Sequence, residues 1–190
     1  IAFNNLPALK ILAVGSTNKF KDLELKDLPK LESLGLEYSN VESIKLFNLP
    51  SLTRIDALLA KLNYVELKQL PALLHLDIKS NLLKKLELKN LPKLYAMYCS
   101  ENLLEELTIE NIPKLQDLYC RWNNLKAIYY KENTFPQGLD FNNFDKNIED
   151  YGWGEMKKRL DEEMPEGGVY IPASATDISL SPQKDKDKRR

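Results

Sequence analysis

The stretch NLPKLYAMYCSENLLEELTIE (residues 90–110) and the stretch NIPKLQDLYCRWNNLKAIYYK (residues 111–131) align along their whole length without a gap. Both begin with an asparagine, an apolar residue and a proline, and the same kind of phrase recurs upstream. The six prolines are spaced by 22, 21, 21, 21 and 21 residues, at Pro7, Pro29, Pro50, Pro71, Pro92 and Pro113. A fixed period of this length indicates a solenoid in which each repeat forms one coil.

Each period holds two apolar patterns. The first is a template that reads L-x-x-L-x-I-x-x-N-x-L over residues 73–83. The second is a two-residue alternation, such as Leu-Glu-Leu at residues 86–88, which is typical of a β-strand. We therefore expect two short strands per coil, because 21 residues leave no room for a long helix as well. The Leu-Pro step should form a corner, since proline has no backbone donor for a central strand.

The template asparagine recurs at Asn81, Asn102 and Asn123, which predicts a continuous asparagine ladder across those coils. The second and third coils have Ser39 and Ala60 at the same place. The turn backbone of these coils must find other partners, because buried backbone donors and acceptors need them.

The template resembles that of the leucine-rich repeat family, L-x-x-L-x-L-x-x-N/C-x-L, over residues 1–131. The 21-residue form, with Cys99 and Cys120 at the template position, is similar to repeats in surface and secreted proteins of Bacteroidetes-type bacteria. The resemblance implies an α/β-type, mostly β, right-handed solenoid with two short parallel strands per coil. It also implies a binding module of a bacterial surface or secreted protein or lipoprotein, located outside the cell, with the cysteines as core residues.

Composition excludes several classes. Leucine accounts for 35 of the 190 residues, and 33 of these lie before residue 140. Two cysteines are too few for a disulfide scaffold, and one histidine leaves little material for a zinc site. The 27 basic and 28 acidic groups are balanced, which disfavours nucleic acid as a partner, and no apolar run is long enough to span a membrane.

The two ends differ from the repeats. Residues 1–7 align with residues 86–92, so the chain begins inside a second strand, and we expect it to be part of a longer protein. Residues 132–168 are expected to form a C-terminal cap, with a short helix over residues 151–164. Residues 169–190 are expected to be an extended linker or the start of another segment, with a strand possible at Val169–Pro172.

The residues between the inward template positions should face solvent and stack in columns from coil to coil. The middle column reads Ala13, Gly35, Asp56, Asp77, Tyr98 and Tyr119, and the column before it reads Ile11, Ser33, Arg54, His75, Ala96 and Asp117. Tyrosine, tryptophan and arginine are enriched at interface hot spots. The predicted partner-binding residues are Arg54, Asp56, Leu58, Leu59, His75, Asp77, Lys79, Tyr98, Asp117, Tyr119, Arg121 and Trp122.

A protein partner is the leading prediction for this face. The alternatives are glycan binding at Tyr98, Tyr119 and Trp122, and a structural spacer in which the tyrosines only support one another. The neighbouring carboxylates Asp56 and Asp77 resemble the spacing of a glycosidase pair, but an open sheet offers no cleft. Binding of a cation, or ion pairing with Arg54 and Lys79, is therefore preferred. We expect no enzyme activity, cofactor or metal. The opposite flank, with its glutamate and lysine mixture, is expected to be a solvated face.

Overall fold

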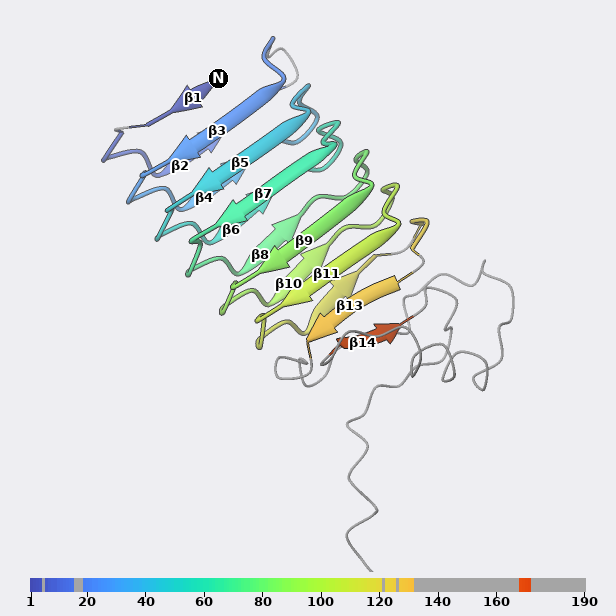
Figure 1. The fold of residues 1–190 in the computed structure, drawn as a ribbon. Coiled ribbons are helices and arrows are strands. Elements are labelled where there is room, and N and C mark those ends of the chain that lie inside the picture. Colours follow the sequence, from blue (N-terminus) through green and yellow to red (C-terminus); the bar gives the residue numbers. More distant parts are fainter. Residues whose placement is uncertain (5, 16–18, 121, 126, 132–167, 172–190) are drawn as a thin grey trace, which may run out of the picture.

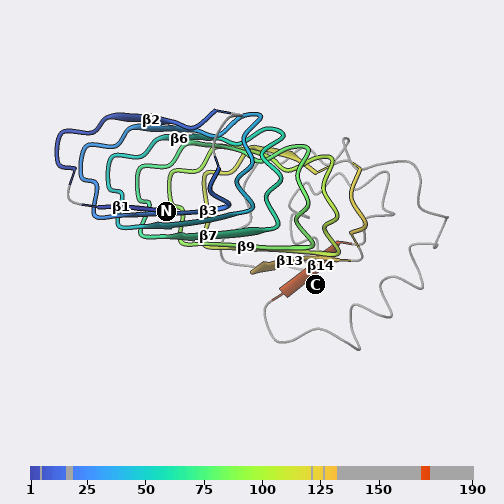
Figure 2. The ribbon, with the colours of Figure 1, turned by 90° about the horizontal axis from the view of Figure 1, so that it is seen from above.

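The computed structural model describes residues 1–190 except 5, 16–18, 121, 126, 132–167 and 172–190. Within the described residues the chain is a mostly β parallel solenoid without a helix (Figure 1). Seen from above, the strands form two layers joined by corners (Figure 2). The two strands predicted for each coil are confirmed. The predicted helix over residues 151–164 lies outside the described residues.

One layer is a continuous six-stranded parallel sheet of three-residue strands, which we term the short-strand sheet. Its register pairs equivalent residues of successive coils, so the predicted columns are confirmed; for example, Asp56 pairs with Asp77 and Tyr98 with Tyr119. The strands are β2 (Ile11–Ala13), β4 (Ser33–Gly35), β6 (Arg54–Asp56), β8 (His75–Asp77), β10 (Ala96–Tyr98) and β12 (Asp117–Tyr119).

The other layer, which we term the long-strand flank, contains two four-stranded sheets, in the orders β1-β3-β5-β7 and β14-β13-β11-β9. Hydrogen bonding is therefore interrupted between β7 and β9. The strands are β1 (Ala2–Phe3), β3 (Asp22–Lys26), β5 (Ser43–Phe47), β7 (Tyr64–Lys68), β9 (Lys85–Lys89), β11 (Glu106–Glu110), β13 (Ala127–Lys131) and β14 (Gly168–Ile171).

Strand β1 pairs in parallel with β3, in the place predicted by the alignment of residues 1–7 with a second strand. Strand β14 pairs antiparallel with β13 and covers the free edge of that strand. The possible strand at Val169–Pro172 is thus confirmed for Gly168–Ile171. A parallel strand at that place would have required another coil, whereas an antiparallel one needs only a returning segment.

The core lies between the two layers and is filled by the template side chains. The central inward column is 0–2% exposed at Leu34, Ile55, Leu76, Met97 and Leu118. Parallel strands covered on one side by this core alternate buried and open residues, as β9 does with its burial of Leu86 and Leu88. Most of the leucines therefore serve burial and carry no chemistry.

The asparagine ladder is confirmed at Asn81, Asn102 and Asn123. The Asn102 Nδ2 group donates to the carbonyls of its own turn and of the preceding coil, and its Oδ1 accepts the Leu83 N–H at 3.1 Å. In the third coil, which has alanine at this place, Asn81 Oδ1 accepts from both Ala60 N and Leu62 N. The Leu62 bond is the regular ladder bond, equivalent to that of Leu83 with Asn102, and the irregular coil gains only the bond from Ala60 N.

The second coil uses a different solution. Ser39 is buried, and its Oγ accepts the Val41 N–H at 3.3 Å. The hydroxyl replaces one of the ladder bonds within its own turn.

Candidate functional site

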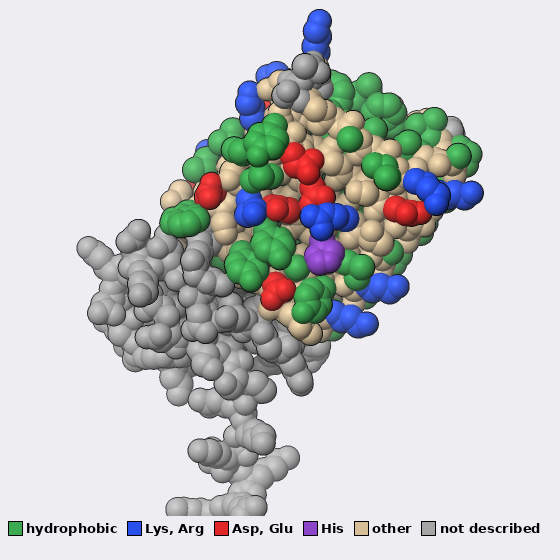
Figure 3. Space-filling view, turned by 180° about the vertical axis from the view of Figure 1, so that it is seen from behind, with side chains coloured by type: hydrophobic (Ala, Val, Ile, Leu, Met, Phe, Trp, Pro, Cys, Tyr) green, Lys and Arg blue, Asp and Glu red, His purple; other side chains and the backbone are tan. Residues whose placement is uncertain are grey.

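The predicted partner-binding residues gather on the outer face of the short-strand sheet. Arg54 pairs with His75, and Asp56 with Asp77, so four of them form a compact square on β6 and β8. Figure 3 shows this face, where charged side chains gather over the middle of the sheet with apolar side chains beside them. The tertiary structure thus brings together residues that are 21 positions apart in the sequence.

The carboxylates of this square are paired with cations. Arg54 Nε donates to Asp56 Oδ2 at 2.6 Å, and this hydrogen bond raises the pKa of Arg54. Lys79 Nζ lies 3.5 Å from Asp77 Oδ2, and the Lys79 N–H donates to the other oxygen of that carboxylate. The predicted ion pairs with Arg54 and Lys79 are confirmed. A carboxylate held in this way by an exposed cation is suited to recognising a charged partner.

An aromatic group continues the face on β10 and β12. The rings of Tyr98 and Tyr119 stack with centroids 4.9 Å apart and an interplanar angle of 6°. Lys79 Nζ lies 5.5 Å from the centroid of the Tyr98 ring. Burial raises the pKa of the Tyr98 hydroxyl, with a further contribution from Asp117. Tyr98 is therefore contacted by a ring from the following coil and a cation from the preceding one, so its ring presents an edge to solvent.

A third feature borders the sheet at the turn that follows each short strand. One column of non-glycine residues there has left-handed backbone, with φ of 53–56° at Tyr38, Leu59, Ser80, Glu101 and Trp122. Three of these residues are large, apolar and exposed: Tyr38 at 60%, Leu59 at 46% and Trp122 at 58%. The predicted site contained Leu59 and Trp122, but the backbone conformation that they share could not be read from the sequence.

The remaining predicted residues differ in exposure. Leu58 and Asp117 are half-buried, and Arg121 lies outside the described residues. Two expectations for the columns are wrong. Ala96, expected to face solvent, is only 2% exposed, because its methyl group is short and its column neighbours His75 and Asp117 are larger. Ser100, expected to face solvent in the same column as Leu58 and Lys79, is only 6% exposed.

The two cysteines are buried, as predicted, and are free. A hydrogen bond with Cys120, together with complete burial, raises the pKa of the Cys99 thiol. These thiols pack as small apolar groups of the core.

Within the described ranges, no cluster of three or more histidine, cysteine, aspartate or glutamate residues could hold a metal ion. No helix in that part of the chain is long and apolar enough to cross a membrane.

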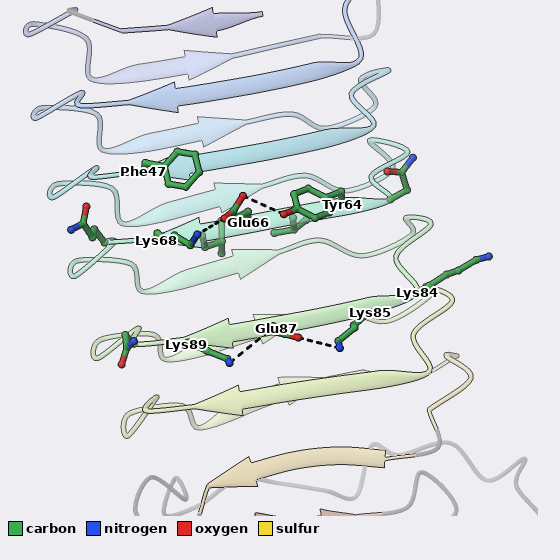
Figure 4. Close-up of a pocket in the computed structure, with 13 residues that line it drawn as sticks. Phe47, Tyr64, Glu66, Lys68, Lys84, Lys85, Glu87 and Lys89 are labelled. Carbon is green, nitrogen blue, oxygen red and sulfur yellow. Dashed lines mark hydrogen bonds and ion pairs between the residues drawn. The ribbon is translucent and has the colours of Figure 1, made fainter.

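A separate feature, which was not predicted, lies on the long-strand flank. Between β7 and β9 there is a hollow of about 1020 Å³, lined by both strands, by the turn residues next to them and by Phe47 of β5 (Figure 4). We term this break, bounded by residues 64–68 and 85–89, the seam. Glu66 is paired with Lys68 at 2.5 Å on β7, and Glu87 is paired with Lys85 and Lys89 on β9. These pairings lower the pKa of both glutamates.

A signal for the seam is present in the sequence. Continuing the register of this flank places Glu66 beside Glu87 and Lys68 beside Lys89. Like charges that are directly opposite destabilise strand pairing. The flanking pairs are instead complementary, as for Lys45 with Glu66, and Lys89 with Glu110. Reading the columns for charge repulsion, and not only for solvation, would have marked this ladder as the weakest of the flank.

No protein-family model matches this chain, and no significant similarity to a curated protein or a solved structure is found. The functional argument therefore rests on the geometry described above.

Proposed function

We propose that this chain is a non-catalytic recognition module of the leucine-rich repeat type that binds a protein partner through the short-strand sheet. It would belong to a surface or secreted bacterial protein, as its repeats suggest by their resemblance. The observation that carries the proposal is the column of exposed apolar residues in left-handed turns at Tyr38, Leu59 and Trp122.

The column is unfavourable for folding. A left-handed backbone costs an L-amino acid about 1–2 kcal/mol, and glycine or asparagine reduces this cost. The other corner of each coil also has positive φ, but there the residues are chiefly those that tolerate it: Asp27, Asn48, Gln69, Asn90 and Asn111. Large apolar side chains in the first column therefore gain nothing from the turn. Contact with a partner would explain why these side chains are present, since strained positions cluster at functional sites.

The chemistry of the face suits a protein. It combines ion-paired acidic and basic groups, tyrosine edges that carry hydroxyls, and isolated apolar side chains at one border. Interfaces are enriched in tyrosine, tryptophan and arginine, with charged groups around them. An open sheet without an enclosing cleft is also the shape expected for contact with a large surface.

Glycan binding is the second candidate, and the exposed indole of Trp122 supports it. Sugar rings stack on flat aromatic faces. The faces of Tyr98 are covered by Tyr119 and approached by Lys79, so the stacked pair offers less for sugar binding than was expected. This favours a protein partner over a glycan.

The test compares the chain with a variant carrying Tyr38→Asn, Leu59→Asn and Trp122→Asn. Each protein is immobilised and exposed to a bacterial surface-protein extract and to a glycan array. The proposal expects specific protein retention that the variant loses while its thermal stability is kept or raised. A matched control, Tyr95→Asn, removes an aromatic that is 40% exposed and belongs neither to the predicted partner-binding residues nor to the seam, and it should retain the same proteins.

Two results would overturn the proposal. Loss of glycan retention alone would assign the face to carbohydrate. Identical retention by the variant and the wild-type chain, with both folded, would favour a spacer in which the exposed residues have no partner.

A further inference from the structure

We propose that the seam between β7 and β9 is an insertion site for an extended peptide, which would join the two sheets of the long-strand flank as an added strand. This site lies on the opposite side of the core from the proposed recognition face and is independent of it. The peptide would carry outward lysine and glutamate at alternate positions and apolar residues between them.

The first argument concerns the backbone. The ladder at the start of the long strands recurs from coil to coil, with Asn63 N donating to Glu42 O and Glu105 N donating to Lys84 O. At their ends, Asn48 N donates to Lys68 O and Asn90 N donates to Glu110 O. Among the described residues, no equivalent bond joins β7 to β9. Two strand edges therefore face one another, each a template for pairing with another chain.

The second argument concerns burial. Leu67 is 8% exposed, whereas its equivalents in the neighbouring long strands, Leu46 and Leu88, are completely buried. Val65 is only partly buried, although Ile44 in the same place on β5 is fully covered. Solvent thus reaches the core through the seam. Apolar side chains of an inserted strand would close this opening and gain burial.

The third argument concerns charge. Each glutamate of the seam is paired along its own strand, and no ion pair crosses from β7 to β9 in the described structure (Figure 4). By contrast, Lys85 and Lys89 do pair across the next ladder, with Glu106 and Glu110 at 3.5 Å. A strand with lysine between Glu66 and Glu87, and glutamate between Lys68 and Lys89, would replace two repulsive contacts by four attractive ones.

Insertion of a strand requires the seam to widen. Neighbouring strands lie about 4.8 Å apart, so the strands on either side of an inserted one are about 9.6 Å apart. Cα atoms of β7 and β9 lie within 8 Å of one another, so the two strands must move apart to admit the peptide. The unbroken short-strand sheet holds the coils together on the opposite side during this opening. Addition of a strand to a sheet is a known mode of peptide recognition.

The experiment uses two fluorescein-labelled peptides of identical composition, ESIKLEN and ESIELKN, and measures binding to the whole chain by fluorescence anisotropy. Inserted parallel to β7 and β9, the first peptide places its lysine between Glu66 and Glu87 and its second glutamate between Lys68 and Lys89. The second peptide exchanges this lysine and glutamate, so that like charges face one another. We expect the first peptide to bind at least about tenfold more tightly, because four cross-strand charge pairs change sign. Hydrogen exchange should show amides of β7 and β9 that exchange faster than those of β3 and β5 and become protected by the first peptide.

The matched variants are E87K/K89E/E110K and E110K alone. The triple variant makes the columns complementary across the seam, so it should pair β7 with β9 and lose at least about tenfold in peptide affinity. E110K leaves both like-charge contacts of the seam in place and should bind as the wild-type chain does.

Equal binding of the two peptides, no binding of either, or undiminished binding by the folded triple variant would overturn the proposal. Exchange in β7 and β9 that is as slow as in β3 and β5 would also overturn it. Light scattering that shows a dimer sealed through these strands would assign the seam to a second copy of the chain instead.

Discussion

Replacing Asn102 by alanine should destabilise the solenoid strongly, although the residue lies in a turn. Its side chain is 5% exposed and contacts four backbone groups. Three of these are carbonyls that keep another donor in the variant: Ile78 O accepts from Asn81, Cys99 O from Asn123, and Ser100 O from Ser80 N. The Leu83 N–H has no such replacement, because it donates to Asn102 Oδ1.

The magnitude follows from this inventory. An orphaned buried donor costs about 1–3 kcal/mol, and each hydrogen bond lost from a group that keeps another partner costs about 1 kcal/mol. The amide supplies two donor hydrogens, which it shares among the three carbonyls. The expected loss for Asn102→Ala is therefore about 3–5 kcal/mol in the free energy of unfolding.

The measurement is equilibrium unfolding in urea, followed by circular dichroism, for the wild-type chain, Asn102→Ala and the control Asn111→Ala. Asn111 is an exposed asparagine of the other corner, and its Nδ2 donates to Asn90 Oδ1 at 2.8 Å. The control should lose about 1–2 kcal/mol, because it loses one exposed hydrogen bond and places alanine in left-handed backbone at φ 56°. A loss at Asn102 no larger than that of the control, with an unchanged urea slope, would refute the assignment of the ladder as a principal stabilising element.

Three further outcomes are expected. Leu59→Asn should raise the free energy of unfolding in urea by about 0.5–1 kcal/mol, since asparagine tolerates the left-handed turn, and a decrease would contradict strain at this position. Tyr98 has a raised pKa in the folded chain, so its contribution to stability should be complete below about pH 10 and fall as the pH rises further. Absorbance titration checks the pKa, and an equal loss of stability at alkaline pH in Tyr98→Phe would show that another group causes the loss. Cys99 and Cys120 should react with a disulfide reagent only as fast as the chain unfolds, and rapid labelling of both in the native chain would contradict their burial.

The repeating pattern was sufficient to predict the coils, because period and burial are local properties of the sequence. The inward template, the two strands per coil and the ladder from Asn81 to Asn123 all follow from which residues recur every 21 positions. The columns of the short-strand sheet follow too, since a fixed repeat length sets the register. Ala96 and Ser100 were exceptions, because their exposure depends on the surrounding side chains and not on the pattern.

Other features required the tertiary structure. The positive φ of Leu59 and Trp122 reflects closure of the coil, which overrides their own preference for right-handed or extended backbone. The mutual stacking of Tyr98 and Tyr119 depends on the distance between coils.

The seam shows most clearly where sequence and structure each contribute. The sequence alone contains the repulsive columns, Glu66 with Glu87 and Lys68 with Lys89, but their effect could not be decided from it. Repulsion across one ladder competes with the cohesion of a shared leucine core and of a continuous sheet behind it. Only the packed solenoid shows the outcome: the core and the short-strand sheet remain intact, and the long-strand flank opens at the ladder where Glu66 faces Glu87 and Lys68 faces Lys89.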